Sequence, residues 1–236
     1  MLKHFLLGAL LLVVPACASK SSQTDTLPAP PGKVLIIGDS IALGLGAMGP
    51  DTSCPLTPEF NTLRHSFGVQ VADELRVGYE MFAWPGIGLV RNYGTDQTNT
   101  MSNRLSRPDE IKRLEAAKPV QLVLVNLGTH DFFENDPSET FEPAMEDLLT
   151  MLSTRYPDAT IYALTGPMLH GLDDALHDKA VREAIDAVNA ANGTQVRYLA
   201  LDGGDEAVAH GCQWHPSVPA HDRMTQMILE DMKARK

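Results

Sequence analysis

The sequence predicts an α/β fold with three layers, in which helices cover both faces of a doubly wound parallel sheet of about five strands. Two observations predict it. Short apolar runs without a helical period recur along the chain, as expected for strands buried on both faces. Between them lie longer segments whose apolar residues repeat at the spacing of one helix face. Their regular alternation is typical of parallel strands joined by crossover helices.

The expected elements follow one another in chain order. Strands are expected over residues 34–37, 79–84, 120–127, 159–164 and 196–201. Helices are expected over residues 61–75, 108–118, 137–156, 173–192 and 217–232. The segments 47–58, 91–108 and 202–214 are rich in Gly, Pro, Asn or Thr and predict loops. The second of these loops could line a cleft; the alternative is that it is simply an ordered surface excursion.

Residues 1–16 predict a signal peptide of the lipoprotein type. Lys3 precedes an apolar stretch, residues 5–14, that is too short to span a bilayer but suits the core of a signal peptide. A small residue followed by Cys17 looks like the lipidation site of a bacterial lipoprotein; Pro15 is unusual there, and ordinary signal cleavage is the alternative. We therefore expect a lipid-anchored protein of the bacterial cell envelope, at the outer membrane on its periplasmic side or surface. Without lipidation at Cys17, it would be secreted or periplasmic.

The rest of the chain suits one folded domain. Residues 17–32 are rich in Ser, Thr, Pro and Ala and predict a flexible tether, which leaves residues 33–236 for the domain. The formal charge of −11 disfavours nucleic acid and anionic membrane surfaces as partners, because nothing would neutralise phosphates. Membrane contact is expected only through the lipid anchor, and the protein is expected to be a monomer. No dinucleotide or phosphate-binding glycine motif is present, so no cofactor is expected.

Three cysteines are present, and two of them are expected to pair. If Cys17 carries lipid, Cys54 and Cys212 remain in an oxidising compartment, where a disulfide between them would close a long loop. The alternative is a pair of buried free thiols.

Ser40 is the candidate nucleophile. The first strand ends at Gly38, and Asp39 and Ser40 follow at the carboxyl edge of the sheet, where open α/β sheets place their ligand sites. A helix is expected to follow, and the N–H groups at its start would stabilise a developing anion. The alternative is that Ser40 only caps this helix.

His215 is the candidate base, because serine chemistry needs a proton acceptor within hydrogen-bond reach. It lies between the last strand and the last helix, in a loop that can reach over Ser40. Four other histidines are expected to face solvent instead: His170, His177, His210 and His221. A metal site built from His210, His215 and His221 is disfavoured, because their spacing does not place them on one helix face.

Four motifs, in this order along the chain, resemble the sequence blocks of the SGNH (GDSL-type) hydrolases. They are Gly38-Asp39-Ser40, Gly86, the Gly-Thr-His-Asp motif of residues 128–131, and His215. A closer likeness, to carbohydrate esterase family two, rests on residues 54–55, 86–93, 126–129, 166–168 and 211–216. The resemblance implies a flavodoxin-like SGNH hydrolase fold and an acyl-enzyme mechanism.

The resemblance also implies a role for each matched residue. Ser40 attacks an ester carbonyl, and His215 takes the proton and later activates water. The N–H groups of Ser40 and Gly86 hold the oxyanion, with a side-chain donor at position 130. The family pattern has Asn where this chain has His130, whose neutral imidazole offers one N–H; the alternative is that His130 merely packs.

A second departure concerns the group that orients His215. The wider superfamily has Asp three residues before its catalytic His, and this chain has Cys212 there. Members of the similar esterase family include enzymes with a Ser-His dyad whose His is oriented by a main-chain carbonyl, so we predict a dyad. Asp202, Asp205 and Glu206 are the alternative orienting groups.

Together with Ser40 and His215, the resemblance implies a serine esterase that removes O-acetyl groups from carbohydrate. Trp214 is a candidate to stack on a sugar, or simply packs. Asp39 and Asp131 are expected to bind turn backbones rather than substrate. One alternative is an esterase or lipase acting on lipidic or small aryl esters. A second alternative is a catalytically silent binding protein of the envelope.

Overall fold

The computed structural model describes residues 32–193 and 195–235. The expected signal peptide, the lipidation site Cys17 and nearly all of the expected tether lie outside the described residues. Within the described part of the chain, no helix has the length and apolarity needed to cross a membrane.

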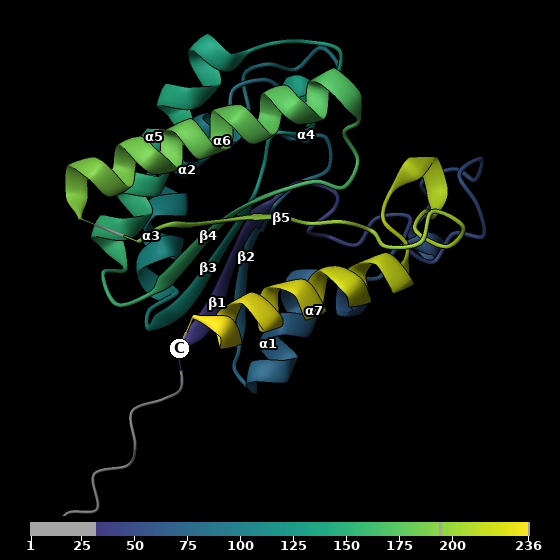
Figure 1. Ribbon diagram of the computed structural model, residues 1–236, viewed down its shortest axis with the longest axis horizontal. Helices are drawn as coiled ribbons and strands as arrows, with labels where there is room; N and C mark the ends of the chain where they lie inside the picture. The colour runs from purple at the N-terminus through teal and green to yellow at the C-terminus, as the bar shows by residue number, and fades with distance from the viewer. Residues whose placement is uncertain (1–31, 194, 236) are drawn as a thin grey trace, which may run out of the picture.

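The core of the fold is a parallel sheet of five strands in the order β2-β1-β3-β4-β5 (Figure 1). The strands are β1 (Lys33–Gly38), β2 (Tyr79–Ala83), β3 (Val120–Asn126), β4 (Thr160–Thr165) and β5 (Arg197–Ala200). The expected five-strand parallel sheet is thereby confirmed. The central strands β1, β3 and β4 are buried on both faces, which explains why their sequences are apolar without alternation.

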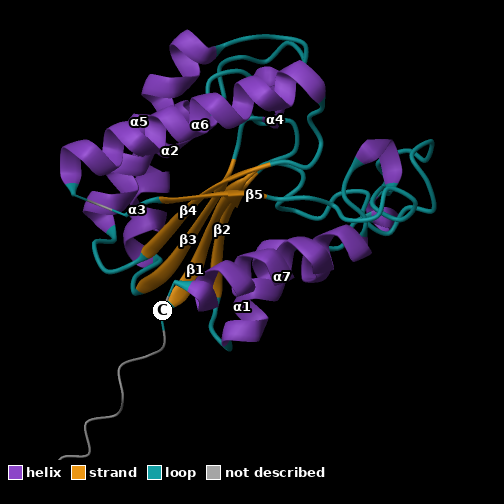
Figure 2. Cartoon of the chain, in the orientation of Figure 1, coloured by secondary structure: helices purple, strands orange, loops and turns teal. Residues whose placement is uncertain are grey.

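Helices cover both faces of the sheet, as Figure 2 shows. One face carries α1 (Phe67–Leu75) and α7 (Val218–Ala234), and the other carries α2 (Met101–Leu105), α3 (Pro108–Ala116), α4 (Thr129–Phe132), α5 (Ser138–Arg155) and α6 (Gly171–Asn192). Alternate residues of β1 enter separate cores: Val34 and Ile36 pack with α1 and α7, whereas Leu35 and Ile37 pack with the other layer. This alternation produces the three layers.

Two local expectations are wrong. Residues 40–48 form successive turns instead of a helix, and α1 begins at Phe67 rather than at residue 61. Gly44 has a positive φ of 65°, and the N–H of Thr62 donates to its carbonyl oxygen. This pairing holds both segments in non-helical conformations. Ser40 therefore caps no helix.

The loop after β1 and the loop before α7 lie side by side beyond the carboxyl edge of the sheet (Figure 1). Because all five strands are parallel, the segments that follow β1, β2 and β3 also emerge at this edge. The fold thereby gathers Ser40, Gly86, His130 and His215 from distant parts of the sequence.

Candidate active site

Ser40 and His215 meet across the carboxyl edge of the sheet. Ser40 Oγ lies 2.9 Å from His215 Nε2, although 175 positions separate the two residues. Both side chains are largely buried, with 3% and 6% exposure. The geometry is that of a hydroxyl next to the base that would take its proton.

A main-chain carbonyl contacts the other ring nitrogen of His215. Nδ1 lies 3.2 Å from the carbonyl oxygen of Cys212, which requires Nδ1 to carry the hydrogen and leaves Nε2 free to accept one. The alternative orienting carboxylates have other partners: Asp202 binds Arg223, Asp205 accepts from the N–H of Ala207, and Glu206 binds His210. The contact therefore has the form that the resemblance implied for a dyad.

The electrostatics keep His215 in its neutral form. Burial lowers the pKa of His215 below 6.5, while the nearby Asp39 carboxyl and the Cys212 carbonyl raise it in part. Burial raises the pKa of Asp39 to about 6, although the N–H of Ile41 and the charge of His215 lower it in part. Asp39 Oδ1 accepts from the N–H of Ile41 at 2.8 Å, as expected. Its electrostatic effect on His215 was not expected from the sequence, since only the tertiary fold makes them neighbours.

Gly86 and His130 are linked through Tyr93, whose N–H donates to the Gly86 carbonyl at 2.8 Å and whose ring lies 5.8 Å from the His130 ring, measured between the centroids. Gly86 has a φ of +74°, a conformation that side chains other than glycine adopt only with strain. Within the described residues, no hydrogen bond uses the backbone N–H of Ser40 or that of Gly86. Burial lowers the pKa of His130, and the ring is close enough to His215 to lower the pKa of that residue as well. His130 Nε2 is buried with no hydrogen-bond partner in the described chain.

Asp131 joins the segment after β2 to α4. Its buried carboxylate accepts from the N–H groups of Leu89, Val90 and Arg91 at 2.8–2.9 Å. The Arg91 guanidinium in turn donates to the His130 carbonyl at 3.0 Å. Asp131 thus binds turn backbones, as expected, and these contacts connect the segment that follows Gly86 to the helix that carries His130.

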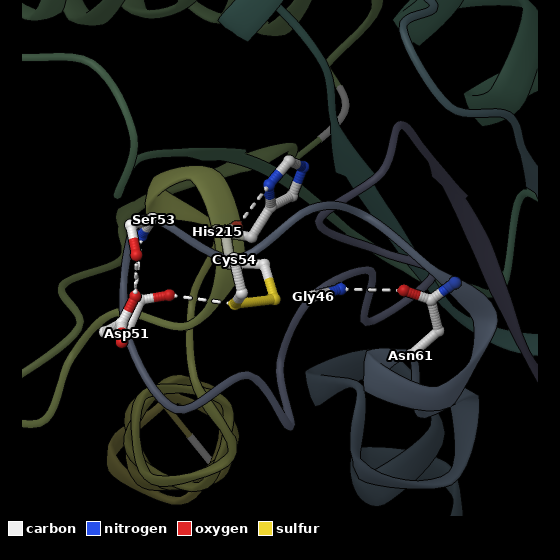
Figure 3. Close-up of a disulfide and its surroundings, with 7 residues drawn as sticks. Gly46, Asp51, Ser53, Cys54, Asn61 and His215 are labelled. Atoms are coloured by element: carbon white, nitrogen blue, oxygen red, sulfur yellow. Dashed lines mark hydrogen bonds between the residues drawn. A yellow bond between two sulfur atoms is a disulfide. The ribbon is translucent and has the colours of Figure 1, made fainter.

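The expected disulfide between Cys54 and Cys212 is present, with their Cα atoms 4.8 Å apart. Figure 3 shows it beside the hydrogen bond of His215. Trp214 is 57% exposed, and its ring packs against that of His210 with 5.3 Å between the ring centroids. Trp214 directly precedes His215 in the sequence.

A cavity of about 160 Å³ lies beside Gly86. Its lining comprises Trp84, Pro85, Gly86, Ile87, Asn92, Tyr93, Asp96, Asn99 and Arg104. The guanidinium of Arg104 stacks over the ring of Trp84 at 4.4 Å. The expectation that the segment 91–108 lines a cleft is therefore confirmed. The individual lining residues were missed because that segment has no regular pattern, and the short helix α2 within it was not expected.

Two of the histidines expected at the surface are buried. His177 and His221 have exposures of 1% and 0%. His177 Nε2 lies 2.9 Å from the carbonyl oxygen of Leu127, and His221 Nδ1 accepts from the N–H of Phe67. Each ring therefore satisfies a buried backbone group, which is why a polar side chain is tolerated in these cores. His170 is exposed, as expected.

Known proteins with similar sequences and folds include esterases. The chain is 31% identical over 205 residues to the cellulase/esterase CelE of Acetivibrio thermocellus, a match that covers 85% of this chain and 25% of that protein. It is 24% identical over 234 residues to an acetylxylan esterase/glucomannan deacetylase of Cellvibrio japonicus, covering 92% of this chain and 63% of that one. The chain thus spans less than two thirds of each of these relatives.

A solved structure shares the fold. A family two carbohydrate esterase from Clostridium thermocellum, in complex with cellohexaose, superposes with a TM-score of 0.80 at 29% identity. The match covers 88% of this chain and 66% of that one. The sequence pattern of the GDSL-like lipase/acylhydrolase family matches residues 36–224, which include Ser40 and His215. The chain belongs to the GDSL-like lipase/acylhydrolase family.

Proposed function

We propose that this protein is a serine esterase that removes O-acetyl groups from carbohydrate through a Ser40–His215 dyad. The observation that carries the proposal is the 2.9 Å contact between Ser40 Oγ and His215 Nε2, with Nδ1 turned to the Cys212 carbonyl. A general base needs a proton donor at one ring nitrogen and an acceptor that orients the ring at the other. Ser40 Oγ and the Cys212 carbonyl occupy these two positions. The esterase relatives support the same class of reaction.

The proposed reaction has two steps. Ser40 Oγ attacks the acetyl carbonyl carbon while its proton passes to His215 Nε2. The bond between that carbon and the sugar oxygen then breaks, and the sugar oxygen takes the proton from Nε2. Water next attacks the acetyl-serine with His215 as base, which releases acetate and restores the Ser40 hydroxyl.

The N–H groups of Ser40 and Gly86 are the proposed oxyanion donors, with His130 as the side-chain donor. Both backbone groups have no other partner among the described residues. Because burial lowers the pKa of His130, its neutral ring would supply a single N–H to the oxyanion.

A carbohydrate suits the surroundings better than a long acyl chain. The cavity beside Gly86 combines Trp84 and Tyr93 with Asp96, Asn99 and Arg104, which are groups that stack on sugar rings and bond to hydroxyls. Exposed Trp214 offers a further stacking surface next to His215. A lipase would need a broad apolar channel for its acyl chain.

Hydrolysis of p-nitrophenyl acetate, butyrate and octanoate by the purified protein and by Ser40→Ala tests this proposal. We expect preference for acetate and its loss in the variant, followed by release of acetate from acetylated xylan and glucomannan. Preference for octanoate would instead indicate a lipase. Equal rates for the variant and the wild type, or no labelling of Ser40 by a fluorophosphonate probe, would contradict the mechanism.

We also propose a lipid anchor at Cys17, supported by the signal-like segment that precedes it. In a bacterial host fed a labelled fatty acid, label is expected in the wild type and absent from Cys17→Ser. Label in both proteins would contradict the anchor.

A further inference from the structure

Two consecutive residues before His215 have left-handed backbone conformations. Gln213 has φ 50° and ψ 44°, and Trp214 has φ 64°. Neither is glycine, and such conformations persist at non-glycine residues only where the surroundings enforce them. They form the short 3-10 turn η3 (Cys212–Trp214), which directs the chain back on itself.

In this turn, the Cys212 carbonyl oxygen contacts both the backbone N–H and the ring of His215. The backbone N–H of His215 donates to the Cys212 carbonyl oxygen at 3.1 Å, and the ring Nδ1 lies 3.2 Å from the same oxygen. The position of the Cys212 carbonyl therefore sets the orientation of the ring, and through it the distance from Nε2 to Ser40.

The turn is held by the loop that follows Ser40, residues 46–54, and the contacts come from several points along it. The N–H of Cys212 donates to the Gly46 carbonyl at 3.0 Å, and the N–H of Gln213 donates to the Thr52 carbonyl at 3.1 Å. The Cys54–Cys212 disulfide is the covalent member of this set. Figure 3 shows Gly46, Cys54 and His215 around it.

The two loops pack without spare room around the sulfur atoms. A Cβ atom on Gly49 would lie 2.3 Å from Cys212 Sγ, and one on Gly211 would lie 2.1 Å from the Gly46 carbonyl oxygen. The N–H of Gly211 also donates to the His215 carbonyl at 2.8 Å, which closes the turn. Cys212 itself is fully buried.

We propose that the Cys54–Cys212 disulfide is a positioning device for the base. It holds the left-handed turn at Gln213 and Trp214, and this turn keeps His215 aligned with Ser40. The inference rests on the proposed dyad but adds that the reactivity of the dyad depends on the redox state of this cysteine pair. Without the bond, the turn relaxes to ordinary backbone angles and the Cys212 carbonyl leaves its place beside Nδ1.

The first test compares Cys54→Ser with the wild type, with and without dithiothreitol. We expect kcat for p-nitrophenyl acetate to fall by about two orders of magnitude, KM to change little, and fluorophosphonate labelling of Ser40 to slow in parallel. Circular dichroism should report an unchanged fold. Leu152→Ala is the matched control, because it opens a cavity in α5 far from both loops; it should lower Tm without lowering kcat.

Substitutions at Gln213 test the turn itself. In the Cys54→Ser background, Gln213→Gly should recover part of the lost kcat, because glycine adopts a positive φ without strain. With the disulfide intact, Gln213→Pro should lose kcat as Cys54→Ser does, because proline cannot adopt a φ of 50°. If Cys54→Ser does not fold, the wild type reduced with dithiothreitol tests the disulfide, and Gln213→Pro tests the turn.

The failures of the two proposals are distinguishable. Absence of labelling in the oxidised wild type would overturn the serine mechanism. Normal labelling of both the reduced wild type and Gln213→Pro would leave the dyad intact and overturn the positioning role of the disulfide.

Discussion

The buried carboxyl of Asp39 lies close enough to His215 for its charge to raise the pKa of the imidazole, against the stronger lowering by burial. Asp39 lies near the beginning of the domain's sequence and His215 near its end. The chain has no carboxylate three residues before the histidine. Asp39, adjacent to Ser40 in sequence, thus supplies negative charge near the proposed base without a direct hydrogen bond to its ring.

The pH dependence of kcat/KM should reflect the lowered pKa of His215. The neutral ring is the active base, so activity should be lost only as the pH falls below 6.5. Hydrolysis of p-nitrophenyl acetate between pH 4.5 and 8 measures this limb. A midpoint above 6.5 would show that burial does not dominate at this site.

Asp39→Asn should shift that acid limb to still lower pH, because the carboxylate charge that raises the pKa of His215 is then gone. The amide oxygen can still accept from the N–H of Ile41, so the turn should persist. An unshifted limb would mean that Asp39 does not affect the base.

The same substitution should stabilise the protein increasingly as the pH rises from about 4 to 6, with the full gain above pH 6. The pKa of Asp39 is raised to about 6, so the folded state binds a proton that the unfolded chain releases near 3.8, and stability is lost as the pH rises through this window. Asn does not ionise, so the variant avoids this loss, which amounts to up to about 3 kcal/mol in the free energy of unfolding. Urea unfolding of the variant and the wild type at pH 4 and pH 8 would show it as a gain that is small at pH 4 and full at pH 8.

His130→Ala should lower kcat by about 10²-fold with little change in KM, because a donor to the oxyanion acts mainly in the transition state. His130→Asn, which introduces the residue of the family pattern, should retain most of the activity. If both variants match the wild type in kcat, then His130 only packs, and another N–H serves the oxyanion.

His177 should make the fold sensitive to acid. Burial lowers its pKa to about 4, so the unfolded chain binds a proton between pH 6.5 and 4 that the folded state does not. Stability contributed by the neutral ring is therefore lost as the pH falls, by about 3 kcal/mol. In His177→Gln, the free energy of unfolding should depend less on pH in this window, whereas exposed His170→Gln should leave the dependence unchanged. Equal slopes in His177→Gln and the wild type would contradict this assignment.

Local patterns were sufficient to predict the strands and most helices. The strands β1, β3 and β4 are buried on both faces, so their apolar residue types alone predict their burial. Ser40, Gly86, His130 and His215 follow strands or precede a helix, and parallel topology gathers such positions at one edge. The pairing of Cys54 with Cys212 followed from their number and the expected compartment.

The remaining features depend on contacts between distant segments, which no local pattern records. The hydrogen bond between Gly44 and Thr62 holds the segment after Ser40 in a non-helical conformation. His177 and His221 are buried because their rings form hydrogen bonds with the backbone groups of Leu127 and Phe67.

The sequence by itself thus determined the α/β architecture and the residues available for catalysis, because hydrophobic periodicity and strand ends are local properties. Only the tertiary structure decided that the Cys212 carbonyl contacts His215 and that Asp39 lies near its ring. Hydrogen bonds and charge effects at this range depend on the packing of loops that the sequence leaves far apart.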